Sequence, residues 1–418
     1  MGVTKNQGEP DWQLTLATAA ASSFYSLTGA SRKAAEVTSS SKTAGDLIQK
    51  AWGMVSRPAI KNLSLQVSRI LKNAAVADRI EISGVSCFVL SVDPAPELTA
   101  AIDSFQKKYG QKAVRTLSTI DEQEEHAPAM KHTTKPFARS SLSVHRQRDV
   151  ILHLTGGGFF AHIIASDLPY LLDWSAATGS VVICPEYGLL PQHTFPDPLE
   201  QVCDVYQSLV NGDLVSILGF EVNRIVVTGE STGGNLAAAL CVKLSLDEAC
   251  NNDNGRTHLS ENGPTNENQA SVIYPDALML SCPVLNLSLE LSHSRVLGTD
   301  DPVLPRGLIS AISDAYLPPR LGVSKKNPLA SPLFASDSML SRFPPTLLIA
   351  SSKDPLLDDS VAFNQRLRSN GIESDLRAAD NLPHAYLGLG TAGFPEAVQV
   401  QKECVEWLSM QLSKERNG

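Results

Sequence analysis

Residues 229–234 read GESTGG and lie between two segments of different character. The residues before them, 225–228, are apolar and β-branched, which predicts a buried strand. The run after them, 235–246, is rich in Ala and Leu and predicts a helix. A serine at such a sharp strand-to-helix turn needs small neighbours, because glycine lets the backbone pass closely while the serine side chain projects above the sheet. Ser231 is therefore a candidate nucleophile.

A second glycine-rich segment, TGGGF at 155–159, also follows an apolar run, residues 150–154. Three glycines in sequence expose backbone N–H groups that can bind an oxyanion. The alternatives are a flexible turn or a phosphate-binding loop. However, no Lys-Ser/Thr pair follows the glycines, and the chain has no GxGxxG with a later acidic partner. With Ser231 downstream, the pattern favours an oxyanion hole.

Two further polar residues follow expected strands. Asp354 belongs to SKDPLLDD (352–359), and His384 belongs to LPHAY (382–386). Asp358 and Asp359 are expected to cap the helix that begins near residue 360. The order Ser, Asp, His, with each residue on a loop after a strand, matches the α/β-hydrolase triad and differs from the orders in chymotrypsin and subtilisin.

Beyond residue 149, short β-rich runs alternate with amphipathic helices. Such alternation is typical of a mainly parallel sheet that has helices on both faces. The sequence therefore predicts an α/β fold with a mostly parallel central sheet. The expected strands are residues 149–155, 180–184, 224–228, 277–281 and 346–350.

Together these motifs resemble the hormone-sensitive lipase family of α/β-hydrolases, from about residue 149 to near the C-terminus. Six segments match family blocks in order and approximate spacing. They are LHLTGGGFFAH (152–162), EYGLLPQHTFPDPLEQ (186–201), GESTGGNLAAAL (229–240), SPLFA (331–335), PPTLLIASSKDPLLDDS (344–360) and LPHAYLGL (382–389). The resemblance implies the α/β-hydrolase fold and a serine carboxylic-ester hydrolase that needs neither a metal nor an organic cofactor.

The same resemblance implies a role for each motif residue. Ser231 corresponds to the nucleophile, His384 to the general base and Asp354 to the carboxylate that orients the histidine. Ester cleavage would then proceed through an acyl-enzyme.

The oxyanion hole implied by the resemblance consists of Gly157, Gly158 and the N–H of Thr232. Thr155 stands where the family usually has a histidine, so the hydrogen bonds that hold the glycine loop are expected to differ. Thr232 replaces the usual alanine and places a β-branched side chain beside the oxyanion site, which is expected to slow acyl transfer. Glu230 replaces the commoner aspartate and is expected to have a milder effect.

The chain of 418 residues suggests two to three domains at about 150 residues each. Residues 1–140 match no motif, and we expect them to form a helical N-terminal cap or regulatory region. Within them, residues 44–80 have apolar positions at helical spacing, and residues 81–92 suggest a strand.

The catalytic domain is expected to span residues 141–414, with a disordered Asn-rich insertion at about 247–270. By resemblance, an excursion at about 290–328 completes the cap. The apolar positions of residues 303–317 fit equally well a helix that lines an acyl pocket and a helix that packs in the core.

Composition excludes several classes of protein. Hydrophobic residues make up 43% and charged residues 19%, as in ordinary globular proteins. A net charge of −9 without basic blocks argues against nucleic-acid binding. No apolar run approaches the roughly 18 residues of a membrane-spanning helix. The seven scattered cysteines predict reduced thiols in the cytoplasm, although the Ser/Ala-rich stretch at 12–31 leaves organelle targeting open.

Two functions compete at this stage. One is a hydrolase of lipid or small esters, and the other is a catalytically weak or silent ligand-binding receptor on the same fold. The filled triad favours the enzyme, while the altered glycine loop keeps the receptor in consideration. The same triad can also cleave amides. The expected partners are an ester substrate and, transiently, a lipid surface, with the chain a monomer or homodimer.

Overall fold

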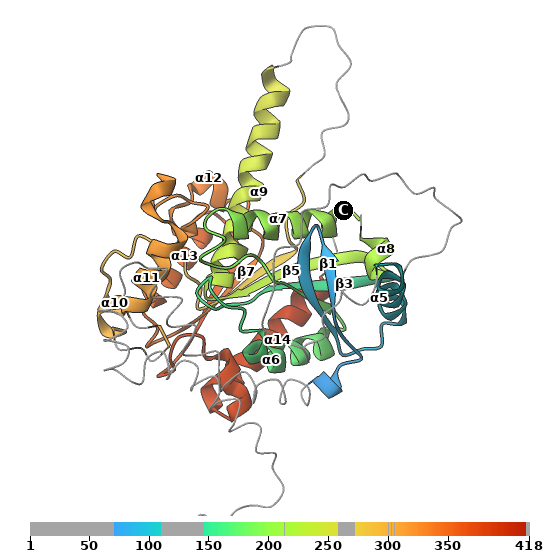
Figure 1. Ribbon diagram of the computed structural model, residues 1–418. Helices are drawn as coiled ribbons and strands as arrows, with labels where there is room; N and C mark the ends of the chain where they lie inside the picture. Colours follow the sequence, from blue (N-terminus) through green and yellow to red (C-terminus); the bar gives the residue numbers. More distant parts are fainter. Residues whose placement is uncertain are drawn as a thin grey trace, which may run out of the picture.

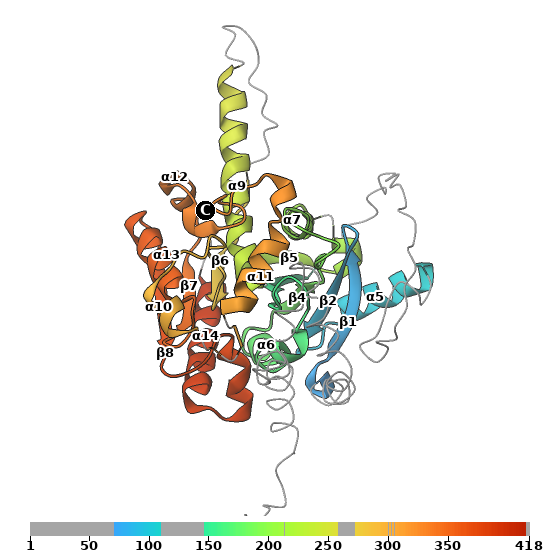
Figure 2. The same ribbon diagram turned by 60° about the vertical axis from the view of Figure 1, so that its left-hand side comes forward.

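The computed structural model describes residues 71–109, 146–212, 214–257, 272–299, 301, 303–304 and 306–414. Within them, eight strands form one sheet in the order β1-β2-β4-β3-β5-β6-β7-β8. At one edge, β1 (Val76–Ile82) pairs antiparallel with β2 (Val85–Ser91), which pairs antiparallel with β4 (Val181–Pro185). Figure 2 shows β1 and β2 on the opposite side of the molecule from β7 and β8.

The other strands all run parallel to β4 and to one another. Their carboxyl ends therefore meet at one edge of the sheet, which is where ligands bind in folds of this class. The predicted mostly parallel α/β sheet is confirmed. The five strands are β3 (Gln147–Leu154), β5 (Glu221–Glu230), β6 (Ala277–Ser281), β7 (Thr346–Ser351) and β8 (Ser374–Ala379).

Helices cover both faces of the sheet (Figure 1). On one face, α6 (Ile164–Thr178) and α14 (Pro395–Ser413) pack against each other and on the strands. On the other face, α9 (Thr232–Thr257) crosses β3, β5 and β6, while α13 (Leu357–Ser369) packs on β7 and β8. The remaining helices are α5 (Pro96–Tyr109), α7 (Asp197–Val210), α8 (Val215–Leu218), α10 (His293–Leu297), α11 (Arg306–Tyr316) and α12 (Asp337–Leu340), with 3₁₀ turns at Leu71–Asn73, Pro319–Leu321, Pro332–Phe334 and Tyr386–Ala392.

Two hydrophobic layers explain why the strands read as nearly continuous apolar runs. In β3, Val150, Leu152 and Leu154 point into the layer beneath α9, whereas Ile151 points into the layer beneath α6 and α14. Every residue of β4, β6 and β7 is buried. A strand covered on both faces needs apolar side chains at every position, because neither face meets water.

The N-terminal region differs from its prediction in two respects. Residues 76–91, which were assigned to a helical cap, form two strands of the central sheet itself. Residues 76–80 were expected to end a helical stretch, but they belong to β1, so the helix prediction is wrong there. The buried residues of β1, Val76, Ile80 and Ile82, lie on one face of the strand, and pairing with β2 along its whole length holds the segment extended. Of the strand expected at 81–92, residues 81–82 end β1 and residues 85–91 form β2. The boundary near residue 140 and most of the proposed cap, residues 1–70, lie outside the described residues.

Helix α9 is longer than the sequence suggested. It continues to Thr257, so residues 247–257 of the expected disordered insertion are helical, and residues 258–271 lie outside the described part. In the part of the chain that the structure describes, no helix combines the length and apolar character needed to cross a membrane.

Candidate active site

Ser231 occupies the turn between β5 and α9. Its backbone has φ = 54°, a left-handed value that is strained for a non-glycine residue. The turn closes tightly: a Cβ on Gly233 would lie 1.9 Å from the carbonyl oxygen of Leu154, and one on Gly229 would lie 2.4 Å from that of Gly233. Both glycines of the motif are therefore sterically required, and they hold the serine at the carboxyl end of the sheet.

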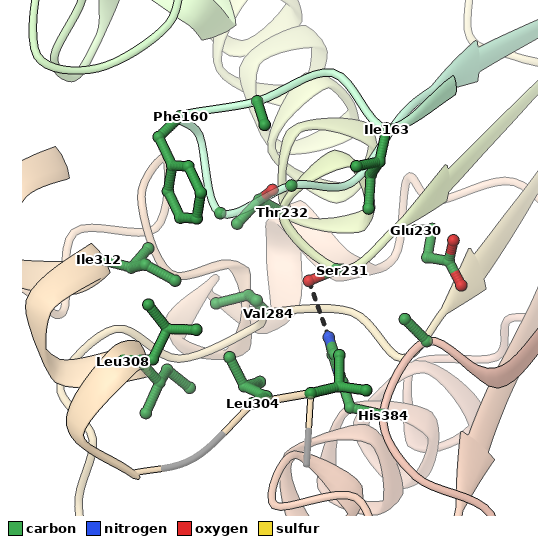
Figure 3. Close-up of a pocket in the computed structure, with 16 residues that line it drawn as sticks. Phe160, Ile163, Glu230, Ser231, Thr232, Val284, Leu304, Leu308, Ile312 and His384 are labelled. Atoms are coloured by element: carbon green, nitrogen blue, oxygen red, sulfur yellow. Dashed lines mark hydrogen bonds between the residues drawn. The ribbon is translucent and has the colours of Figure 1, made fainter. Parts of the chain in front are cut away.

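His384 connects the two other predicted triad residues. Its Nε2 lies 2.9 Å from Oγ of Ser231, and its Nδ1 lies 3.0 Å from Oδ2 of Asp354 (Figure 3 shows the first of these bonds). Since a carboxylate only accepts, Nδ1–H donates to Asp354, and Nε2 is left to accept the serine proton. Asp354 is fully buried, and its Oδ1 accepts the N–H of Leu356. The structure thus brings all three residues together.

The surroundings of His384 raise the pKa of its imidazole. Burial alone would lower the pKa of this imidazole, but the charge and hydrogen bond of Asp354 outweigh burial, and Asp301 adds to them, so the pKa lies above its ordinary value. Burial raises the pKa of the neighbouring Cys282 thiol, which is hydrogen-bonded to Asp354. Ligand atoms of Cys282, Asp354 and His384 lie within 4.8 Å of one another, but both ring nitrogens of the histidine already serve Ser231 and Asp354.

The predicted oxyanion loop has the backbone that close approach requires. Gly157 has φ = 123° and Gly158 has φ = 67°, both unfavourable for residues with a side chain. A Cβ on Gly157 would lie 2.1 Å from the carbonyl oxygen of Ala161. Both glycines line the same pocket as Ser231 and Thr232. The residues expected to form the oxyanion hole are therefore adjacent to Ser231, the predicted nucleophile.

A histidine missed by the sequence analysis anchors this loop. Nε2 of His162 lies 2.9 Å from the carbonyl oxygen of Tyr187 and must donate to it, while burial lowers the pKa of His162 and keeps the ring neutral. Nδ1 is then an acceptor, 3.2 Å from the hydroxyl of Thr155. The phenol of Tyr187 donates to the carbonyl oxygen of Thr155 at 2.7 Å. Threonine at position 155, where the family usually has a histidine, indicated that another residue holds the loop.

Thr232 makes a polar contact that its sequence position did not reveal. Its hydroxyl accepts the backbone N–H of Phe159 at 3.4 Å and is hydrogen-bonded to the phenol of Tyr187. The side chain predicted to crowd the oxyanion site therefore also ties the glycine loop to the start of α9. Phe159 has φ = 62°, so the backbone that Thr232 holds is itself strained.

Above Ser231 lies an open, largely apolar pocket with about 750 Å³ of empty space. Leu308, Ile309 and Ile312 of α11 line it, opposite Phe160 of the glycine loop (Figure 3). Tyr316, on the same helix, is fully buried and its ring stacks on that of Phe159 at 3.8 Å. Helix α11 therefore does both things left open by the sequence, since it lines the pocket and packs in the core.

A buried polar cluster lies next to Ser231. Glu230 is hydrogen-bonded to Asp167 and accepts the phenol of Tyr170 at 3.3 Å. Burial, reinforced by the charge of Asp167, raises the pKa of Glu230 well above its ordinary value. On the other side of this cluster, Nε2 of His153 lies 3.3 Å from Oδ2 of Asp167. Glutamate in place of the commoner aspartate at position 230 thus places a carboxyl group with a raised pKa directly before Ser231 in the chain.

Asp358 and Asp359 connect helices. Helix α13 begins at Leu357, so both residues lie in its first turn, near positive backbone N–H groups. Asp358 accepts the N–H of Ser294 at 2.8 Å, and Asp359 pairs with the buried Arg295. Neither caps a helix that begins at residue 360, as was expected. They attach α10 to the loop that carries Asp354.

Comparison with known proteins agrees with this geometry. Residues 151–388 match a family model described as the alpha/beta hydrolase fold. An esterase of Gibberella moniliformis is 28% identical over 71% of this chain and 90% of its own length, and the hormone-sensitive lipase of Mus musculus is 30% identical over 53% of this chain and 25% of its own length. The crystal structure of an esterase from the bacterial hormone-sensitive lipase family superposes with a TM-score of 0.60 at 18% identity, covering 97% of this chain and 100% of the other.

The family model covers more than half of the chain, and hormone-sensitive lipases are among the relatives that match it in sequence. The relatives named here are esterases and lipases, which gives no support to the receptor alternative. The chain belongs to the hormone-sensitive lipase family of α/β-hydrolases.

Proposed function

We propose that this chain hydrolyses carboxylic esters, with Ser231 as nucleophile, His384 as general base and Asp354 as its orienting carboxylate. The observation that carries the proposal is the continuous hydrogen-bond chain from Oγ of Ser231 through both nitrogens of His384 to Asp354, at the base of an apolar pocket. A serine hydroxyl is a weak nucleophile until an adjacent base removes its proton.

Each step follows from this arrangement. Oγ of Ser231 attacks the ester carbonyl carbon as its proton moves to Nε2 of His384, and the carbonyl oxygen becomes an oxyanion near Gly157, Gly158 and Thr232. The imidazolium then returns the proton to the departing alcohol, which leaves an acyl-serine. A water molecule, deprotonated by the same nitrogen, then attacks the acyl carbon, and the imidazolium returns this proton to Oγ of Ser231 as the acyl–serine bond breaks and the acid is released.

The pocket supports an apolar group on one side of the ester bond. Its side-chain lining is aliphatic or aromatic apart from Ser231, Thr232, Glu230 and His384. We therefore infer substrates with an aliphatic acyl or alkyl group, and a series of p-nitrophenyl esters of increasing acyl length would locate the optimum.

Free thiols at all seven cysteines are compatible with the reducing cytoplasm inferred from the sequence.

The direct test replaces the nucleophile. Ser231→Ala should abolish hydrolysis of p-nitrophenyl butyrate and labelling by a fluorophosphonate probe, while its melting temperature stays near that of the parent protein. Ser338→Ala, at an exposed serine of α12, is the matched control and should retain both. Hydrolysis retained by folded Ser231→Ala protein would contradict the proposal.

A further inference from the structure

Asp301 lies in the segment between α10 and α11 and is nearly completely buried, with 5% of its surface exposed. Its carboxylate accepts three backbone N–H groups. Oδ1 accepts those of Val303 at 2.8 Å and Leu304 at 2.7 Å, and Oδ2 accepts that of His384 at 3.0 Å. A buried carboxylate is costly unless its oxygens are satisfied, and here the three donors come from two separate parts of the site.

One of these parts is the pocket wall, because Val303 and Leu304 both line the cavity above Ser231. The other is the loop that carries the proposed base. This loop makes a sharp turn directly after the histidine, where Ala385 has φ = 54°. A backbone in that left-handed region persists only when its surroundings hold it. The bond from the His384 N–H to Asp301 is such a constraint.

The segment before Asp301 also packs against the loop that carries Asp354, the third predicted triad residue. The N–H of Asp301 donates to the carbonyl oxygen of Gly298 at 3.0 Å. A Cβ on Gly298 would lie 2.9 Å from the nitrogen of Pro355 and 3.0 Å from the carbonyl oxygen of Lys353, the two neighbours of Asp354 in the chain. Gly298 therefore contacts the Asp354 loop, Asp301 contacts the His384 loop, and Val303 and Leu304 line the pocket.

We propose that Asp301 is a positioning residue for the ester hydrolysis inferred above: its carboxylate fixes the main chain of His384 against the pocket wall formed by Val303 and Leu304. An acyl or alkyl group that presses on this wall would then act directly on the placement of the base. The inference rests on the proposed roles of Ser231 and His384. It adds a second carboxylate to the surroundings of the imidazole, which among the described residues also include the carboxylate of Asp354 and the thiol of Cys282.

Asp301→Asn separates positioning from simple stability. The amide oxygen can still accept the N–H groups of Val303 and Leu304, but the amide nitrogen cannot accept that of His384. We expect kcat for p-nitrophenyl butyrate to fall about ten-fold or more per active site, since misplacing a catalytic group by about 1 Å can cost about a hundred-fold. KM should stay within about two-fold because the wall keeps its bonds. Loss of the negative charge should also move the acidic midpoint of the kcat/KM profile to lower pH.

Active sites are counted by titration with a fluorophosphonate, so that unfolded protein does not contribute to the apparent loss. Asp314→Asn is the matched control, because Asp314 lies on α11 with 54% of its side chain exposed, in an ion pair with Lys325. That variant should match the parent protein. An unchanged kcat per active site, an unmoved pH midpoint, or a loss confined to KM in Asp301→Asn would each overturn the positioning role. Failure of the parent protein to react at Ser231 would instead overturn the proposed function.

Discussion

The hydroxyl of Thr155 donates to Nδ1 of His162, 3.2 Å away, across the glycine loop beside Ser231. His162 lies seven residues after the position at which the family usually has the histidine of this motif, and it extends the bond to the carbonyl oxygen of Tyr187. Because Tyr187 donates back to the carbonyl of Thr155, the three residues form a closed cycle. The loop is thus held by a histidine, although the histidine comes from a different position.

We predict that His162→Ala lowers kcat for p-nitrophenyl butyrate by about ten-fold or more, because the loop that presents the oxyanion donors loses its anchor. KM should change little, since Phe160 and the apolar wall remain. Steady-state kinetics on active-site-titrated protein measures both constants. His293→Ala, at an exposed histidine on α10, is the control and should retain parental kcat.

A double-mutant cycle tests whether Thr155 acts through the same bond. Thr155→Val alone should lower kcat about five-fold, the effect of losing one hydrogen bond of about 1 kcal/mol. In the His162→Ala background the same change should have almost no further effect, because the partner is already gone. Fully additive losses would show that the two residues act independently.

Thr232 gives a prediction opposite to the simplest steric expectation. If its methyl group only crowded the oxyanion site, Thr232→Ala would raise kcat. We predict instead that kcat falls about three- to ten-fold, because the hydroxyl holds the N–H of Phe159 and contacts Tyr187. Thr232→Ser separates the two effects, since it keeps the hydroxyl and removes only the methyl group. It should retain at least parental activity.

The sequence predicted the parts of the site that depend on local pattern. The turn at Ser231 and the glycine loop each follow a strand directly, so their positions could be inferred from apolar runs and glycine spacing. His162 and Asp301 could not be found in this way. Their roles depend on side chains and backbone groups that meet only when the loops fold against one another, as in the bond from His384 to Asp301, 83 residues away.

The error at residues 76–80 has a different origin. The segment VADRIEI contains apolar residues compatible with either helical or strand periodicity, and pairing with β2 decides between them. The conformation of a short segment at a sheet edge is decided by the strand with which it pairs. The extent of α9 is similar, because its last turns carry Asn-rich sequence that by itself predicts a loop.

The environment of His384 predicts the pH dependence of activity. The general base must be neutral in the free enzyme, so kcat/KM should fall as pH drops through the pKa of this histidine. Because Asp354 and Asp301 hold that pKa above its ordinary value of 6.5, the acidic midpoint should also lie above 6.5. Rates read at the isosbestic wavelength of p-nitrophenol avoid the titration of the product. A midpoint below 6.5 would contradict this assignment.

Removing the carboxylate partner should have two effects. Asp354→Asn should lower kcat by about ten-thousand-fold, as loss of the orienting carboxylate does in serine proteases, where the wrong imidazole tautomer results. Any residual activity should have its acidic midpoint at lower pH, since the main group that raises the pKa of His384 is gone. If Asp354→Asn lowered the rate but left the acidic midpoint unchanged, a group other than Asp354 would be the main one that raises the pKa of His384.

The glycines of the turn predict a sharp contrast in stability. Gly233→Ala would place a Cβ 1.9 Å from the carbonyl oxygen of Leu154, which is backbone and cannot rotate away. We expect a loss of about 3 kcal/mol or more in the free energy of unfolding, or no folded protein. Gly307→Ala is the control. It lies on α11 with no atom within 4 Å of the added Cβ, and it should stabilise the protein by about 0.5–1 kcal/mol. Urea denaturation measures both.

The raised pKa of Glu230 predicts how stability depends on pH. Burial and the charge of Asp167 raise its pKa well above the ordinary value, so the unfolded chain releases this proton near pH 4.5 while the folded chain retains it. The unfolded state then binds fewer protons, and the free energy of unfolding falls as pH rises above about 4.5. Glu230→Gln removes this dependence. Its stability relative to the parent protein should therefore increase with pH, with a slope of at most about 1.4 kcal/mol per pH unit.

Glu97 provides a control of opposite sign. Its hydrogen bonds, including the one from Arg148, lower the pKa of the carboxyl despite partial burial, so its ionised form stabilises the folded state at pH values above the ordinary pKa. Glu97→Gln should lose stability relative to the parent as pH rises, whereas Glu230→Gln should gain it. Urea denaturation at pH 3.5, 5 and 7 measures both differences, because the Glu97 carboxyl titrates in the unfolded chain near pH 4.5 and changes stability mainly below pH 5, whereas Glu230 changes it above pH 5. If both variants instead lost stability relative to the parent protein as pH rises, Glu230 would be ionised in the folded protein, and its negative charge would act on Ser231.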